Sequence, residues 1–205
     1  QLYADGVIHT VGLSSNGSIL ILSRNDNDAS NLYYSTFDKS KNKWNPITKF
    51  PKEINSKSWE NFGSLSANGD TLYFSSNREG GFGGFDIYMS TKTALGEWTN
   101  PVNLGKNINT PFDEVAPFVT ENSSKLFFSS KGHKTMGGFD LQYSNKEGSS
   151  WSAPINLGYP LNTPDDDSFL FPIGNGNQGY LSKSTIEGDE DIFYVKIDFS
   201  ENKQQ

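Results

Sequence analysis

The chain has 205 residues, of which 34% are hydrophobic and 14% aromatic; this is enough for the core of one domain and argues against a disordered chain. Its 24 acidic residues outnumber its 17 basic residues, and the net charge of −7 disfavours binding to nucleic acid. The absence of cysteine excludes disulfides, thiolate nucleophiles and cysteine-ligated metals, and no apolar run is long enough for a direct membrane span.

Predicted β-strands follow one another along the chain in a pattern that returns about every 53 residues. Each copy has an apolar strand that ends in serine, then a strand preceded by Asp or Asn, and then a tryptophan that opens an outer strand. The fourth copy has no such tryptophan. In chain order these elements are 20–23, 31–34 and Trp44; 72–76, 83–88 and Trp98; 126–130, 137–141 and Trp151; and 179–182 and 188–193.

Apolar residues within each copy alternate or form short runs bounded by Asn-Gly and Gly-Gly turns, which is typical of strands and not of helices. In the third copy the pattern predicts four antiparallel strands, called A to D from the inside outward, at 114–120, 125–130, 140–144 and 151–156. A four-stranded repeat of this length is typical of a propeller blade. The sequence therefore predicts an all-β fold, a β-propeller of four-stranded antiparallel blades.

About four blades fit the chain, at 1–54, 55–108, 109–161 and 162–205. The fourth blade lacks its outer strand, which predicts an uncovered sheet edge near Ile192. Two arrangements remain open. The four blades close alone as a single domain, or they form a segment of a larger propeller with additional blades in a longer parent chain. The second arrangement is favoured, because residues 1–6 align with the connection before strand A and supply no missing outer strand.

Four strings carry a resemblance to a known repeat: residues 65–81, 83–88, 108–114 and 129–133. They resemble WD40-like, TolB-type propeller repeats, most closely those in exported OmpA-family, peptidoglycan-associated envelope proteins of the Bacteroidota, some of which accompany type IX secretion. The resemblance covers nearly the whole chain. It implies an exported protein, periplasmic or associated with the outer membrane, with a binding or scaffolding role, and it implies no reaction.

Side chains that recur in every blade are expected to be architectural. Where a loop enters strand C, an acid or amide can accept backbone N–H bonds and fix the loop. A tryptophan at the start of strand D can cover the apolar face of its blade or seal the blade against its neighbour. The predicted structural residues are Asn31, Asp86, Asp140 and Asp191 at the first position and Trp44, Trp98 and Trp151 at the second.

Blade topology predicts a candidate binding surface. The D–A and B–C loops leave a blade from the same face, and loops on a rigid scaffold commonly carry binding. Acids are expected near the inner strands and bases farther out, in contact with a protein or a cell-envelope glycan. Alternatively, these charges only solvate and link neighbouring blades. The candidate residues are Glu60, Arg78, Asp113, Glu114, Lys131, His133, Asp165, Asp166 and Asp167.

An enzymatic alternative is a glycoside hydrolase or lyase-like enzyme that uses carboxylates at the channel mouth. Glu60 and Glu114 occupy the same repeat position, which favours architecture over a tuned acid–base pair. The sequence therefore predicts that the protein is not an enzyme. It predicts no cofactor, because the G-x-G-x-x-G match at 174–179 lies between two strands. It predicts no metal, because 25–28 and 165–167 lack the ligand spacing of a calcium loop.

Overall fold

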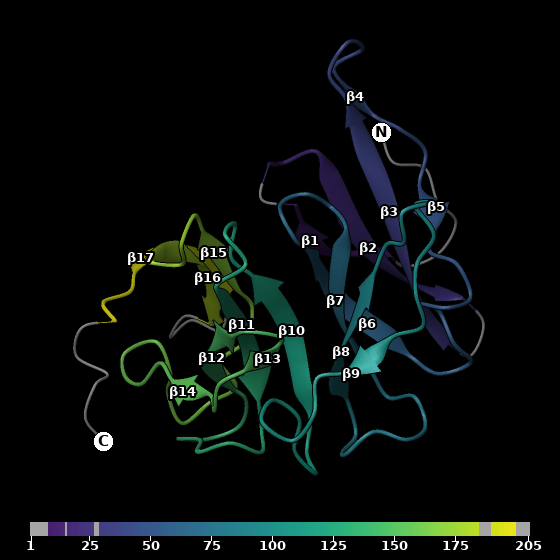
Figure 1. Ribbon diagram of the computed structural model, residues 1–205. Coiled ribbons are helices and arrows are strands. Elements are labelled where there is room, and N and C mark those ends of the chain that lie inside the picture. The colour runs from purple at the N-terminus through teal and green to yellow at the C-terminus, as the bar shows by residue number, and fades with distance from the viewer. Residues whose placement is uncertain (1–7, 15, 27–28, 185–189, 200–205) are drawn as a thin grey trace.

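The computed structural model describes residues 8–14, 16–26, 29–184 and 190–199, and every regular element in these ranges is a β-strand. Four small antiparallel sheets form a ring, and Figure 1 shows them following one another in chain order from purple to yellow. This confirms the predicted all-β fold, a four-bladed β-propeller. No helix that could cross a membrane is present among the residues described.

Each blade is built from consecutive strands that pair in order from strand A outward. Blade 1 contains β1 (Ile8–Leu13), β2 (Ile19–Asp26), β3 (Ala29–Asp38), β4 (Lys43–Trp44) and β5 (Thr48–Lys49). Blade 2 contains β6 (Glu60–Leu65), β7 (Thr71–Ser76), β8 (Asp86–Thr91) and β9 (Val102–Asn103). Blade 3 contains β10 (Glu114–Val119), β11 (Lys125–Ser130), β12 (Asp140–Glu147), β13 (Ser150–Trp151) and β14 (Ile155–Asn156). Blade 4 contains β15 (Leu170–Ile173), β16 (Gln178–Ser184) and β17 (Glu190–Lys196).

The outer strand of blade 3 is broken, where the sequence predicted one continuous strand at 151–156. The two pieces, β13 and β14, both pair with β12, and Pro154 lies between them. Because proline has no backbone N–H, it cannot donate to the ladder, and the pairing stops there. Pro46 and Pro101 follow the tryptophans of blades 1 and 2 in the same way, so the outer strands of these blades are also short.

Blade 4 differs from the others, as predicted. In the part of the chain that the structure describes it has three strands, and β17 pairs with β16 alone. The edge of β17 therefore lies where blades 1 to 3 carry their outer strands.

Three buried clusters hold neighbouring blades together. In each one, strands B and C of one blade present apolar side chains to strand B of the next blade. The side chains that share a cluster in this way are Ile21 and Leu32 with Phe74, Tyr73 and Ile87 with Phe128, and Phe127 and Leu141 with Leu181. Within the described ranges, no such cluster joins blade 4 to blade 1.

Strand A carries a β-bulge in blades 1 to 3, where the register shifts against strand B. Phe62 and Ala116 lie at two of these bulges with φ of 40° and 51°, and Phe169, directly before β15, has φ of 67°. This left-handed conformation is strained for an aromatic residue, and bulges commonly re-aim a side chain. At the inner end of the blades, the strain turns Phe62 and Phe169 towards each other across the ring, with ring centroids 5.0 Å apart.

Candidate functional site

Two of the predicted binding acids, Glu60 and Glu114, open strand A of blades 2 and 3 and are fully buried. The carboxylate of Glu114 accepts hydrogen bonds from the backbone N–H and the hydroxyl of Thr110, both at 2.7 Å, and from Ser130 Oγ at 2.7 Å. Ser56 and Ser76 donate to Glu60 in the same way. Both acids therefore fix the loop that leads into their own strand.

The predicted bases bind the same loops from the other side. Arg78 donates from Nη2 to the carbonyl of Ile54 at 2.6 Å and pairs with Glu60 at 3.2 Å. His133 Nε2 lies 2.9 Å from the carbonyl of Ile108. In blade 4, Lys183 donates to the carbonyl of Pro160 at 3.1 Å and pairs with Asp167 at 3.4 Å.

An asparagine completes each of these junctions, and its role was missed at the level of sequence. Asn109 Oδ1 accepts the backbone N–H of Ile87 at 2.7 Å, and its Nδ2 donates to the carbonyl of Ile87 at 2.9 Å. Asn55 binds Leu32 in the same two-point manner, and Asn162 binds Leu141. The signal was visible, since an Ile-Asn or Leu-Asn pair recurs ten residues after Trp44, Trp98 and Trp151.

We call each such set a junction network: Asn55, Glu60 and Arg78 between blades 1 and 2; Asn109, Glu114 and His133 between blades 2 and 3; and Asn162, Asp167 and Lys183 between blades 3 and 4. The asparagine ties the D–A loop to strand C of the preceding blade. The acid and the base tie it to the following blade. Each network therefore fixes the position of one blade against the next.

Asp113 and Asp166 also make structural contacts. Their Oδ1 atoms accept the backbone N–H of Phe85 and of Phe139, each at 2.8 Å. Lys131 places its Nζ 4.2 Å from the centroid of the Phe139 ring. Asp165 is exposed in the loop that precedes β15.

These contacts give the predicted binding residues partners within the protein. Glu60, Glu114 and Asp167 are buried beneath their loops, whereas Arg78 and His133 bind carbonyl groups and are partly exposed. Of the carboxylates considered for a glycosidase, Glu60 and Glu114 are buried in this way, whereas Asp113 is partly buried and Asp166 is exposed. Burial raises the pKa of Glu114, against the opposing effect of the hydrogen bonds from Ser130 and Thr110. The raised pKa of Glu114 therefore reflects its burial among packed side chains.

The acids predicted to be structural lie where strand C begins. Asp86 accepts hydrogen bonds from the N–H groups of Phe82 and Gly83, and Asn103 donates to it at 2.7 Å. Asp140 accepts the N–H of Met136 and a hydrogen bond from Asn156.

The first and fourth copies of this position differ from Asp86 and Asp140. Asn31 is buried and donates to Asp26 at 3.3 Å. Asp191 is exposed, and the loop before it lies outside the described residues.

The three repeat tryptophans differ in burial. Trp151 is buried and packs edge-to-face on Tyr73 of blade 2. Trp98 is partly buried against Phe50 of blade 1, and Trp44 packs on Phe37 within its own blade. Trp98 and Trp151 thus seal one blade against the preceding one.

A cleft of about 910 Å³ opens at the centre of the ring, between blades 1 and 4. We call it the central cleft. It is lined by Gly12, Leu13, Ser23, Asn25, Trp59, Asn61, Phe62, Phe118, Phe169, Phe171, Tyr180, Ser182 and Ile192. None of these residues was a sequence-based candidate.

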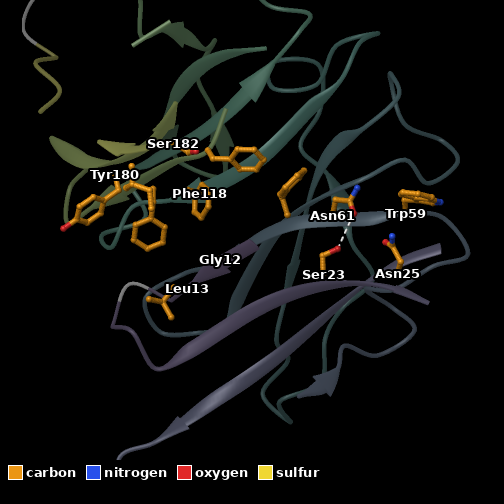
Figure 2. A pocket seen from close by; sticks show the side chains of 13 residues that line it. Gly12, Leu13, Ser23, Asn25, Trp59, Asn61, Phe118, Tyr180 and Ser182 are labelled. Carbon is orange, nitrogen blue, oxygen red and sulfur yellow. Dashed lines mark hydrogen bonds between the residues drawn. The ribbon is translucent and has the colours of Figure 1, made fainter. Parts of the chain in front are cut away.

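The central cleft has a polar side and an aromatic side. Figure 2 shows Ser23, Asn25, Asn61 and Trp59 gathered on one side, with Phe118 and Tyr180 on the other. Ser23 Oγ donates to Asn61 Oδ1 at 3.4 Å. A few amides and hydroxyls within an aromatic lining are typical of binding sites. Within the described ranges, no group of three or more His, Asp or Glu residues is placed to hold a metal ion.

No protein-family model matches the sequence, and no curated protein matches it. Solved structures do match. TolB from Acinetobacter baumannii is 14% identical with a TM-score of 0.52, over 95% of this chain and 44% of that one. A putative TolB from Agrobacterium tumefaciens is 15% identical with a TM-score of 0.61, over 96% of this chain and 61% of that one. An endo-arabinase from Bacteroides thetaiotaomicron is 18% identical with a TM-score of 0.60, over 91% and 72%.

The chain therefore has the fold of a β-propeller similar to TolB-type propellers, and it spans about half the length of those two proteins. The comparison also corrects the prediction that the protein is not an enzyme. The endo-arabinase is an enzyme with a similar arrangement of blades, so a propeller of this kind does not exclude catalysis.

Proposed function

We propose that the protein is an interaction module of an exported cell-envelope protein and that it binds a protein or glycan partner in its central cleft. The observation that carries this proposal is the exposure of large apolar side chains at the cleft. Trp59, Phe169, Tyr180 and Ile192 all line it and are all exposed. Exposed apolar groups gathered in this way are typical of interaction surfaces.

The size and chemistry of the cleft support a binding role. Its volume falls within the range of about 300–1,000 Å³ that is usual for binding pockets. The aromatic rings supply apolar contact area, and the amides of Asn25 and Asn61 supply donors and acceptors that orient a partner. The exported location rests on the resemblance of the repeat strings to envelope propellers and on the structural likeness to TolB.

Retention of envelope components on the immobilised chain tests the proposal. An envelope extract of a Bacteroidota species and its isolated peptidoglycan are passed over wild-type protein and over Ile192→Lys. We expect retention to fall at least about tenfold in the variant, because a lysine would place a charge in the apolar side of the cleft.

The matched control is Val102→Lys, since Val102 is an exposed apolar residue of β9 and does not line the cleft. Circular dichroism establishes that both variants fold. Equal retention by Ile192→Lys and the wild type, or equal losses in the two variants, would remove the cleft as the binding site.

A further inference from the structure

We propose that the partner of the central cleft is a polypeptide that presents an antiparallel β-sheet, and that this sheet packs on the open face of blade 4 as one blade packs on the next. The inference rests on the proposed function and names the class of its partner. It is carried by the different burial of equivalent residues in the four blades.

The strand-pairing registers define which residues are equivalent. In strand C, Leu32, Ile87, Leu141 and Ile192 each pair with the serine near the end of strand B, which is Ser23, Ser75, Ser129 and Ser182 in turn. The first three side chains are 0%, 0% and 2% exposed, whereas Ile192 is 76% exposed. The residue type recurs among the copies, but within the described ranges no neighbouring blade covers the fourth.

Strand B shows the same difference. Ile21, Tyr73 and Phe127 lie two residues before their serines and are 0%, 4% and 1% exposed. Tyr180, in the equivalent position before Ser182, is 47% exposed. Because Tyr180 pairs with Tyr194 and Ser182 pairs with Ile192, these four residues share one face of the sheet. We call it the open face of blade 4.

The three blade interfaces in the molecule show what covers such a face. In each one, the following blade contributes an apolar residue of its strand B, which is Phe74, Phe128 or Leu181. A sheet that presents an apolar side chain at this position would complete the fourth interface. Ile192, the most exposed residue of the open face, is apolar, and the hydroxyls of Ser182 and Tyr194 already donate to Glu190 and Gln178 within the blade. The open face therefore favours a protein sheet over a glycan.

Blade 1 does not offer this cover, either within the chain or from a second copy. Its equivalent of Phe74 is Leu22, which is already buried. Beside it, Arg24 donates to Tyr33 and to Asp26 at 2.6 Å, and this polar group lies on the same face as Leu22. The face that would have to pack on blade 4 is therefore covered within its own blade.

A lengthened chain tests the proposal. Residues 1–198 are followed by a second copy of 148–205, which continues the repeat in register because Ile192 corresponds to Leu141. The chain has no cysteine, so Ile192→Cys in the first copy is a unique reporter. We expect maleimide labelling at this position to be at least about tenfold slower than in the 205-residue chain. Val102→Cys, at an exposed position of β9 in blade 2, is the control and should not change.

Unchanged labelling at position 192 would overturn the proposal, as would an added copy that shows no amides protected from hydrogen exchange. A second arm uses the envelope extract. Retention should survive periodate oxidation of glycans and be lost after protease digestion, and the reverse result would assign the cleft to a glycan. A dimer of the chain that is lost in Ile192→Lys would assign it to a second copy. The proposed function has a separate test: it is wrong if Ile192→Lys retains as much envelope material as the wild type does.

Discussion

Asn109 shows how much of the blade arrangement depends on single side chains. Its amide bonds both the N–H and the C=O of Ile87, which belong to the preceding blade. Neither of these backbone groups is reached by water, because Asn109 and Ile87 are buried. Removal of the amide would leave the buried N–H of Ile87 without a partner, whereas its C=O also accepts the N–H of Leu104 at 3.1 Å.

We expect Asn109→Ala to lower the free energy of unfolding by about 1–3 kcal/mol, because one buried backbone N–H loses its partner. Urea denaturation measures the change. Asn100→Ala, at an exposed position of the preceding blade, is the control and should change stability by less than about 0.5 kcal/mol. A loss in Asn109→Ala no larger than in the control would mean that the junction network does not stabilise the fold.

Asp26 lies at the end of β2 and links the stability of blade 1 to pH. Burial opposes its ionisation, but hydrogen bonds from Tyr33, Arg24 and Lys49 outweigh it and lower the pKa from 3.8 to about 2. A carboxyl group whose pKa is lower in the folded than in the unfolded state stabilises the fold above the unfolded pKa. This contribution is lost as the pH falls through the folded pKa.

We therefore expect Asp26→Asn to be less stable than the wild type by about 1–2 kcal/mol at pH 7, a value reduced for partial exposure to solvent. The difference should shrink as the pH falls from 4 towards 2. Denaturation curves of both proteins across this range provide the measurement. A difference that stays constant with pH would show that the aspartate does not act through its charge.

At the scale of strands and loops, local sequence predicted most of what the structure shows. Serine-ending strands, acids before strand C and tryptophans before strand D are all short-range signals. Blades 2 and 3 contain all three, whereas blade 1 has Asn31 in place of the acid and blade 4 has no tryptophan. The break in the outer strand at Pro154 could also have been predicted, because proline has no backbone N–H to donate to a strand ladder. The burial of Glu114 was not, since it depends on Ser130 and His133, which approach from another loop.

The Gly-rich loop before strand C packs closely on the D–A loop that follows. A Cβ at Gly138 would lie 1.8 Å from Asp166 Oδ1, and one at Gly84 would lie 2.2 Å from Asp113 Oδ1. A side chain in either place would push the two loops apart. These glycines therefore set the distance between the loops.

We expect Gly138→Ala to lower the melting temperature and to reduce stability by about 1–3 kcal/mol, the usual effect of overpacking. Differential scanning calorimetry measures both. In an Asp166→Ala background the same change should be milder, because the clashing carboxylate is gone. Strict additivity of the two substitutions would mean that the clash is not the cause.

At the scale of the whole molecule, the repeat length predicted the number of blades but not the site. Leu141 and Ile192 stand in similar local sequences, yet one is buried and the other exposed, because exposure depends on which sheet lies opposite. The central cleft arises from this uncovered face and from the positive φ of Phe62 and Phe169, which aims both rings inward. No local pattern in the sequence reports either feature.

Because neighbouring sheets cover the faces of the blades to different extents, the blades should differ in local stability. Blade 4 has one face open and three strands among the described residues, whereas blades 2 and 3 are packed on both faces. We expect amides of β16 to exchange with deuterium at least about tenfold faster than those of β7. Mass spectrometry of peptides after exchange makes the comparison. Equal rates would indicate that the four blades open only as one unit.

The prolines in the outer strands have a consequence for the behaviour of the protein at high concentration. An uninterrupted strand edge is a template on which a strand of another molecule can assemble into aggregates, and proline prevents this by removing donors from the rim. Pro46, Pro101 and Pro154 protect three blades in this way. β17 contains no proline and exposes Phe193 and Tyr194, so fibril growth would begin at this edge.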